Sequence, residues 1–304
     1  MYRRVREFWL EADVNRVALA MLPVVVIVAS TSAILVEASD APSSVKVTYR
    51  LVFATVGLLS LSLVRYREQF RRFGRRDLLV TCVTGVVLSA HYLLWFESLN
   101  WTTVAASTTL AQTQTVFVAV LAYAFLGETI TRRTVVGIGF AIAGVAVMSM
   151  GGLTGLEFFH GENPVYGNVL ATVAGMLFAG YLVVSRSIRQ RVDAVPYVTV
   201  VHVFASATAA IFTVGTGTEI ALTAYPKHEW ALFLAMGLGP TLVAQTLANW
   251  TLKYVPSNVV SVAYLGIPIS SSILALVVFA QFPGVGTLVG GVLVLAGIYV
   301  TIRG

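Results

Sequence analysis

The chain has 304 residues, of which 57% are hydrophobic and only 11% are charged. A soluble domain carries roughly 25% Asp, Glu, Lys and Arg, so this composition excludes a soluble enzyme and a free nucleic-acid-binding protein and is typical of a membrane protein. Basic loops on one side of a membrane explain the formal charge of +6, and the single cysteine, Cys82, excludes an internal disulfide and a Cys-based metal cluster.

Ten apolar windows long enough to cross a bilayer follow one another along the chain. A helix needs roughly 20 mostly apolar residues to cross about 30 Å of hydrocarbon. The windows are too long and too uniformly apolar for barrel strands, so they predict an all-α polytopic membrane protein. The first window exceeds the apolar core of a signal peptide, and we expect it to stay as a helix. The windows lie near 16–36, 43–64, 77–97, 102–125, 133–151, 165–185, 195–215, 229–250, 256–279 and 284–302.

The basic residues predict the orientation of these helices. With the N-terminus inside, 17 of the 20 lysines and arginines fall in inner segments, including the arginines between Arg65 and Arg76. Because Lys and Arg in short loops stay on the cytoplasmic side, both termini are predicted to be cytoplasmic in a cell (plasma) membrane. The run from Arg65 to Arg76 could also bind anionic lipid or nucleic acid, but a loop that sets topology is the favoured interpretation.

Polar groups inside the second and third spans are the first candidates for a site, because such groups concentrate on a bundle interior or a wet cavity. Arg50 lies seven residues into the second span; its long side chain can anchor at the interface or contact an anion. His91 and Trp95 share a helical face at i and i+4, with Tyr92 adjacent. An imidazole exchanges a proton near physiological pH, so proton coupling through His91 is a further interpretation.

The fourth and eighth spans add hydroxyl and amide groups. Thr108, Gln112 and Thr115 recur at i, i+4 and i+7, which predicts one polar helical face. Threonine hydroxyls can instead bond to their own helix, but a glutamine amide needs several partners. Gln245 and Asn249 also share a face. We predict that these side chains, with Tyr264 of the ninth span, line a central substrate cavity.

The remaining features predict structural roles. Glu128 lies at a cytoplasmic corner close to Arg132 and Arg133, where capping or ion pairing is expected. Pro268 predicts a kink in the ninth span, with the serines that follow it bonding the freed backbone. Glycines spaced for close packing in the fifth and tenth spans predict helix contacts, with dimerisation as the alternative: Gly137, Gly144, Gly151, Gly286 and Gly290.

The chain repeats itself at an offset of 153 residues, which lays the first five spans over the last five. Rarer residues coincide at this offset, including Ser32 with Ser185 and Gly144 with Gly297. The predicted halves are residues 1–150 and 151–304. Because each half holds an odd number of helices, the second must enter the membrane from the opposite side, and such inverted repeats are typical of transporters that work by alternating access.

The segment from Thr115 to Gly144, with its Leu126-Gly127-Glu128 corner and glycine-spaced helix, resembles the EamA-type drug/metabolite transporter family. That resemblance implies ten helices in two five-helix repeats. It also implies that Arg50 matches a second-helix arginine, and that Thr31 and Ser32 match a polar break in the first helix. Gln281 departs from the pattern, because it replaces the glutamate that corresponds to Glu128.

The predicted function is a secondary transporter that moves a small organic solute, such as an amino acid, metabolite or drug, for export. The alternative is a non-transporting membrane scaffold or a lipid-handling enzyme. No nucleotide-binding loop, zinc-protease or serine-hydrolase motif occurs in the chain, so we expect no catalysis, cofactor, metal or nucleic-acid partner. Membrane lipid is the expected surrounding, and a monomer or weak homodimer is the expected assembly.

Overall fold

The computed structural model describes residues 2–126, 131–154, 163–188, 191–220, 223, 225–251, 254, 263–264 and 266–302. The regular structure in these residues is helical: α1 (Tyr2–Glu37), α2 (Ser43–Arg65), the 3-10 helix η1 (Arg67–Arg72), α3 (Arg75–Trp101), α4 (Val104–Ala111), α5 (Gln114–Leu126), α6 (Arg132–Thr154), α7 (Pro164–Ile188), α8 (Ala194–Gly215), α9 (Lys227–Met236), the π-helix η2 (Gly237–Gln245), α10 (Thr246–Thr251), α12 (Gly266–Phe279) and α13 (Val285–Ile302).

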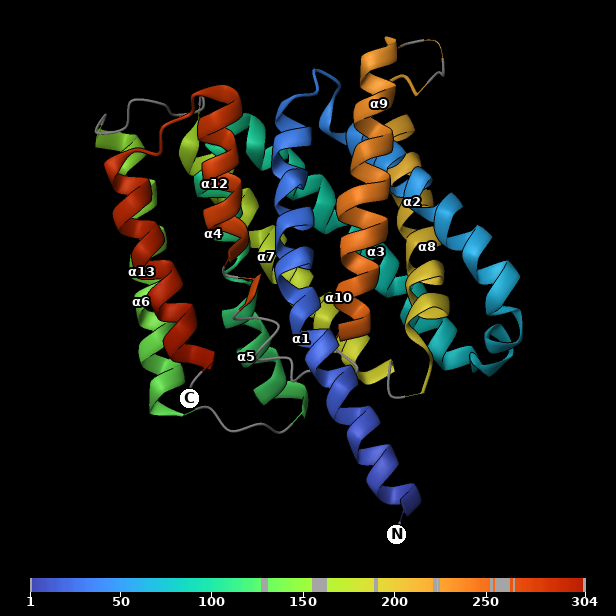
Figure 1. Cartoon of the computed structure of the whole chain (residues 1–304). Helices are drawn as coiled ribbons and strands as arrows, with labels where there is room; N and C mark the ends of the chain where they lie inside the picture. The colour runs from blue at the N-terminus through green and yellow to red at the C-terminus, as the bar shows by residue number, and fades with distance from the viewer. Residues whose placement is uncertain are drawn as a thin grey trace.

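The helices stand side by side as a bundle, and both chain ends lie toward the same end of it (Figure 1). Within the described residues, seven helical segments are long and apolar enough to cross a membrane, and three shorter apolar helices accompany them. Large apolar side chains face outward from the bundle, among them Ile27, Phe125 and Val277, which are 60%, 75% and 77% exposed. An apolar outer surface of this extent is suited to lipid rather than water.

Repeat-equivalent helices run antiparallel to each other. Between α2 and α8, three hydroxyl pairs recur every seven residues: Thr48 with Thr213 at 2.9 Å, Thr55 with Ser206 at 2.7 Å, and Ser62 with Thr199 at 2.6 Å. The residue number rises along one helix as it falls along the other, so the two helices point in opposite directions. This hydroxyl ladder also fixes their register along its whole length.

The α6 and α13 pair shows the same relation more closely. A Cβ on Gly144 would lie 2.6 Å from the Gly290 carbonyl oxygen, and one on Gly297 would lie 2.5 Å from the Gly137 carbonyl oxygen. These positions exchange under the 153-residue offset, so the two contacts are equivalent. Only a residue without a side chain allows backbones to approach this far, which is the packing that the glycine spacing predicts.

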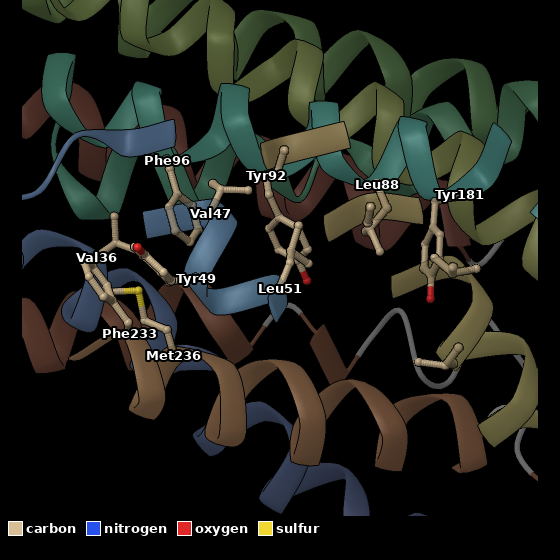
Figure 2. Close-up of a cluster of buried hydrophobic side chains, with 14 of the residues drawn as sticks. Val36, Val47, Tyr49, Leu51, Leu88, Tyr92, Phe96, Tyr181, Phe233 and Met236 are labelled. Carbon is tan, nitrogen blue, oxygen red and sulfur yellow. The ribbon is translucent and has the colours of Figure 1, made fainter. Parts of the chain in front are cut away.

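The largest cluster of buried apolar side chains joins helices of both halves. Tyr92 and Phe96 project from α3 toward Val47 and Leu51 of α2, as Figure 2 shows. Farther along, Tyr49 stacks on Phe233 of α9 with ring centroids 5.1 Å apart. The core therefore holds α2 and α3 against α9, which places the polar side chains of α3 beside the second half.

Two predicted spans depart from a continuous α-helix. The fourth span breaks between α4, which ends at Ala111, and α5, which begins at Gln114. Backbone bonds to the third preceding residue tighten this break, since Gln112 N–H donates to Thr109 O and Thr113 N–H to Leu110 O. The prediction that Thr108, Gln112 and Thr115 lie on one face of a straight helix is therefore wrong, because the helix is interrupted between them. The eighth span widens into the π-helix η2.

Candidate substrate site

A cavity of about 120 Å³ lies where the helices of the two halves meet. Residues of both halves form its wall, which contains aromatic rings, amides and the guanidinium group of Arg50. The first half contributes most of the polar groups, whereas the second contributes small and apolar groups beside Gln245 and Tyr264. The lining residues are Val25, Ala29, Ser32, Arg50, His91, Tyr92, Trp95, Ala111, Gln112, Gln114, Phe178, Pro240, Ala244, Gln245, Tyr264 and Ile267.

Arg50 is the charged member of this wall among the described residues. It is only 2% exposed. Its Nε–H donates to Thr241 Oγ1 at 2.5 Å and its Nη1–H donates to Ser32 Oγ at 2.6 Å. The guanidinium carbon also lies 4.3 Å from the centre of the Tyr92 ring and 5.2 Å from that of Phe96. These neighbours hold the side chain at the cavity instead of letting it extend to the membrane surface.

None of the described neighbours of Arg50 supplies a negative charge. Among pairs in which both residues are described, Arg191 forms an ion pair with Asp77, and His228 Nε2 lies 3.7 Å from Glu229 Oε1. Moving an ion out of water costs several kcal/mol even after relaxation, while a cation–π contact contributes about 0.5–2 kcal/mol. The hydroxyls and rings therefore offset part of that cost but leave the charge of Arg50 uncompensated.

The π-helix explains why Thr241 can reach Arg50. Pro240 has no N–H, so it cannot donate to the Met236 carbonyl four residues earlier. The Thr241 hydroxyl donates to that carbonyl instead, at 2.9 Å. Since its hydrogen is engaged there, its oxygen accepts from Arg50. Pro240 thus leads to a π-helix in which the Thr241 hydroxyl oxygen is held as an acceptor for Arg50. Segments of π-helix are frequent at functional sites.

Aromatic rings form the next part of the wall. The His91 ring lies parallel to Trp95, with centroids 6.3 Å apart, and 4.7 Å from Phe178 of α7. His91 Nδ1 lies 2.8 Å from Ala174 O; because a carbonyl oxygen only accepts, Nδ1 carries a hydrogen and donates it. The Trp95 Nε1–H is buried and has no hydrogen-bond partner in the described chain. The rings give the cavity a flat apolar side.

Amide and hydroxyl groups complete the wall. Gln114 Nε2 donates to Gln112 Oε1 at 3.0 Å, where the fourth span breaks. Tyr92 Oη donates to Gln245 Oε1 at 3.3 Å. Tyr92 and Gln245 are 153 residues apart, so they are repeat-equivalent positions that meet each other. Repeat-equivalent positions of the two halves therefore meet beside the cavity.

The structure separates the predicted substrate residues into two groups. Ser32, His91, Tyr92, Trp95, Gln112, Gln245 and Tyr264 line the cavity, together with Arg50, which was predicted as a structural or gating residue. Thr31, Thr108, Thr115 and Asn249 are not among the lining residues. Thr31 and Thr108 bond to carbonyls of their own helices, as the alternative interpretation of membrane threonines requires.

Asn249 acts one layer behind the cavity. Its Nδ2 donates to Tyr181 Oη at 3.3 Å and to Gln245 O at 2.9 Å. Gln245 Nε2 also lies 3.4 Å from the same tyrosine oxygen. Asn249 and Tyr181 therefore orient Gln245, and a direct contact of Asn249 with a solute stays a prediction.

Of the other two residues predicted as structural or gating, Pro268 is described and Glu128 is not. Pro268 lies in the first turn of α12, where its missing N–H is tolerated, so it does not kink the described part of that helix. Ser272 Oγ donates to the carbonyl of Pro268 itself at 2.7 Å, whereas a proline frees the carbonyl four residues before it, so the expected rebonding stays a prediction. Glu128 lies outside the described residues.

The loop between α1 and α2 is held by a buried acid of α9. Glu229, 2% exposed, accepts hydrogen bonds from Ser39 Oγ at 2.5 Å and from Asp40 N–H at 2.8 Å. Asp40, His228 and Glu229 place potential metal-ligating atoms within 4.8 Å of one another. Because both carboxylate oxygens of Glu229 already accept hydrogen bonds, we regard this corner as a structural contact between the halves.

Comparison with known proteins identifies the fold around this cavity. The EamA-like transporter family matches residues 15–150 and again residues 165–303, so its domain occurs twice. This chain belongs to the EamA-like transporter family. As a family member it is a multi-pass membrane transporter, and a transporter implies a small-molecule substrate.

Relatives of this EamA protein include uncharacterized transporters of a bacterium and an archaeon. YetK of Bacillus subtilis (strain 168) is 25% identical over 254 residues, which cover 81% of this chain and 76% of that protein. A transporter of Archaeoglobus fulgidus is 27% identical over 224 residues, covering 73% and 74%. A crystal structure with a TM-score of 0.64 and 19% identity covers 94% of this chain and 96% of its own, which shows a shared fold.

Sequence reasoning missed the parts of the site that depend on tertiary contact. Phe178 and Ala111 line the cavity but resemble any other apolar helix residues in the sequence. Thr241 holds Arg50, and the one available signal was the Gly237-Leu-Gly-Pro240 segment that precedes it. Glycine and proline in the middle of an apolar span indicate an irregular helix, and such a helix exposes groups that a regular one would bond internally.

Proposed function

We propose that this protein is a secondary transporter that carries a small organic solute through the central cavity by alternating access, in the direction of export. The observation that carries the proposal is the meeting of repeat-equivalent Tyr92 and Gln245 at the cavity wall. A site on the pseudo-twofold axis between two antiparallel halves can be opened to either side by the same relative movement of those halves.

The two halves, residues 1–150 and 151–304, are proposed as inverted five-helix repeats that together provide ten membrane crossings. The antiparallel pairing of α2 with α8 and of α6 with α13 supports this arrangement. Both termini are proposed to be cytoplasmic in the plasma membrane, because the basic loops fall on that side and both chain ends point to one end of the bundle (Figure 1).

The contacts at the opposite end support a conformation closed on the outer side. Glu229 of the second half holds Ser39 and Asp40 of the first. The Val104 N–H at the start of α4 also donates to Gln281 Oε1 at 3.0 Å, again across the halves. These contacts must break before the cavity opens outward, and each costs about as much as a net hydrogen bond, roughly 0.5–3 kcal/mol. Such modest costs are compatible with reversible opening.

The cavity wall supports the proposed roles of the individual residues. Gln112, Gln245 and Tyr92 offer hydrogen bonds, while His91, Trp95 and Tyr264 offer ring surfaces. Sites of this kind, mostly apolar with a few convergent polar groups, are typical for small organic ligands. Proton coupling through His91 remains a prediction, which a flux assay with and without a pH gradient tests.

Reconstitution in liposomes tests the proposed function. Purified protein should give saturable flux of at least one labelled organic solute from a broad panel, and Gln112→Ala and Gln245→Ala should reduce that flux by roughly tenfold or more, because each removes polar contacts at the cavity. Gln69→Ala in η1 is the matched control, since Gln69 is not part of the cavity wall. Absence of saturable flux for the whole panel would reject the proposal.

A further inference from the structure

The charge of Arg50 has no function in the packing described so far. Its hydrogen bonds to Thr241 and Ser32 go to neutral hydroxyls, which leave part of the five N–H donors of a guanidinium group for another acceptor. Thr241 and Ser32 would accept equally well from a neutral amide. A buried cation without a counterion lowers the stability of a fold, so an anion bound beside Arg50 would stabilise this structure.

The cavity is where such an anion has access to Arg50. Arg50 is one of the lining residues, along with Ser32 and Tyr92, which surround its guanidinium group. The described lining residues include no Asp or Glu. An anion entering this space therefore meets a positive charge and no negative one, and the low-dielectric aromatic walls strengthen that attraction.

The other unmatched polar group of the wall is also a donor. Trp95 lines the cavity, and its Nε1–H has no partner in the described chain. An indole N–H can only donate, so a group that satisfies it must be an acceptor. The same kind of partner, one rich in acceptor oxygens, can satisfy both Arg50 and Trp95, although the Trp95 Nε1 atom is itself closed to the cavity in this conformation.

The rings around these donors define the rest of the ligand. His91 and Trp95 lie parallel, and Phe178 packs against His91 at 4.7 Å. The parallel rings present flat apolar faces, while Ala29, Ala111 and Ile267 add aliphatic surface. These surfaces favour an aromatic or otherwise apolar body.

The charge is not repeated in the second half. The position equivalent to Arg50 is Val203, and those equivalent to His91 and Trp95 are Ala244 and Ala248. The helices of the two halves are therefore equivalent, but the polar and aromatic groups of the site come mainly from the first half. The charged end of a solute would face α2 and α3. This asymmetry gives a solute one preferred orientation.

We infer that the cavity selects organic anions that combine one carboxylate-type group, bound by Arg50, with an aromatic or apolar body packed against the rings of α3 and α7. The inference rests on the proposed function, because it takes this cavity to be the solute site. Thr241 and Ser32 are positioning residues here, since they act on the solute through the arginine.

Binding of three matched probes to the purified full-length protein in detergent tests this inference. Phenylacetate, phenylacetamide and phenethylammonium share a ring and differ in charge. We expect phenylacetate to bind about 10- to 100-fold more tightly than the other two, as hydrogen bonds to a charged group predict. Equal binding of the three probes, or no measurable binding of phenylacetate, would overturn the inference.

Variants assign the preference to Arg50. Arg50→Gln should abolish the preference for the carboxylate, whereas Arg50→Lys should keep part of it, because a lysine retains the charge without the planar fork. Arg65→Gln is the matched control, as Arg65 ends the same helix and is exposed. Trp95→Phe should weaken phenylacetate binding about three- to tenfold, while Trp101→Phe, whose Nε1–H donates to Glu97, should not.

Folding of each variant is checked by gel filtration and thermal unfolding. If Arg50→Gln does not fold, Arg50→Lys decides: wild-type selectivity and affinity in that variant would contradict recognition by the guanidinium fork, and partial loss would support it. Selective anion binding without flux of any solute would keep this inference and reject the proposed function. Flux of neutral or cationic solutes that Arg50→Gln leaves unchanged would keep the proposed function and reject the inference.

Discussion

At opposite ends of the bundle, two equivalent contacts join the halves, and they differ in strength. We call these contacts corners. An acid in the first turn of α9, Glu229, holds the loop between α1 and α2. An acid in the first turn of α3, Asp77, contacts Arg191 in the loop between α7 and α8 at 3.0 Å. In each corner, an acid of the third long helix of one half contacts the first loop of the other half.

The environment of the two acids differs. Glu229 is 2% exposed and both its oxygens accept hydrogen bonds, whereas the Asp77 side chain is 15% exposed and that of its partner Arg191 is 62% exposed. Exposed ion pairs contribute about 0–1 kcal/mol, because water and salt screen them and their side chains lose entropy. Buried hydrogen bonds to a charged group contribute about 1.5–3 kcal/mol. The Glu229 contact is therefore expected to hold the two halves more firmly than the Asp77 contact, which predicts that opening at the Asp77 end costs less.

Substitution of the glycines between α6 and α13 should have the largest effect and tests the equivalence of the halves. Gly144→Ala and Gly297→Ala should each lower the free energy of unfolding by about 1–3 kcal/mol, because each new Cβ would press on a carbonyl of the partner helix. Thermal unfolding in detergent measures both. Gly139→Ala on α6 is the control, since no heavy atom lies within 4 Å of its Cβ position; a clear difference between the two test variants would contradict the equivalence.

The corner comparison itself is tested with Glu229→Ala and Asp77→Asn. In a Cys82→Ser background carrying Ala244→Cys in the cavity wall, Glu229→Ala should raise labelling by an impermeant maleimide from the Glu229 end about tenfold. Asp77→Asn should change labelling from the other end by about two- to fivefold or less. Equal effects of the two variants would show that burial does not set the strength of these corners.

The π-helix of the second half is tested against the regular α3 of the first. Thr241→Val removes the acceptor for Arg50 Nε and should destabilise the fold by about 1–2 kcal/mol. Thr84→Val in α3 loses only a bond to Val80 of its own helix, so a loss of about 0.5 kcal/mol or less is expected. Chemical unfolding of both variants measures the difference, and a similar loss in each would remove the special role of Thr241.

The smallest effect is expected at the end of α12. Ala280 has a φ of 52°, a left-handed conformation that costs a residue with a Cβ about 1–2 kcal/mol. The equivalent residue in the first half is Gly127. Ala280→Gly should therefore stabilise the protein by about 1 kcal/mol or less, once the greater freedom of glycine in the unfolded chain is included. A lower melting temperature in this variant would contradict the prediction.

Much of the fold could be predicted from the sequence because a bilayer allows few solutions. The apolar window 43–64 became α2, and window 165–185 became most of α7, since only helices satisfy their backbone inside lipid. The match of Gly144 with Gly297 also indicated the packing of α6 on α13. Seven of the cavity residues were predicted because polar and aromatic side chains in such windows require an interior position.

The details that could not be predicted depend on neighbours distant in sequence. No proline or glycine marks the break at Gln112. In the structure the Ala111 carbonyl faces α7, where a Cβ on Gly175 would lie only 2.8 Å from its oxygen. Periodicity likewise could not decide that Thr108 bonds to its own helix while Gln112 faces the cavity. Both outcomes follow from which helix packs alongside, and a local pattern does not contain that information.

The hydroxyl ladder between α2 and α8 makes this helix pair a reference against which the movement of other helices can be measured. Thr48, Thr55 and Ser62 meet partners at both ends and in the middle of the pair, so a shift of one residue along either helix would break all three contacts at once. Because α2 and α8 belong to different halves, spectroscopic labels placed across this pair should change separation if the halves move as rigid bodies, and keep it if the other helices move around a fixed α2–α8 pair. Changes in the distance from such a label to α1 or α9 would then report the transport movement directly.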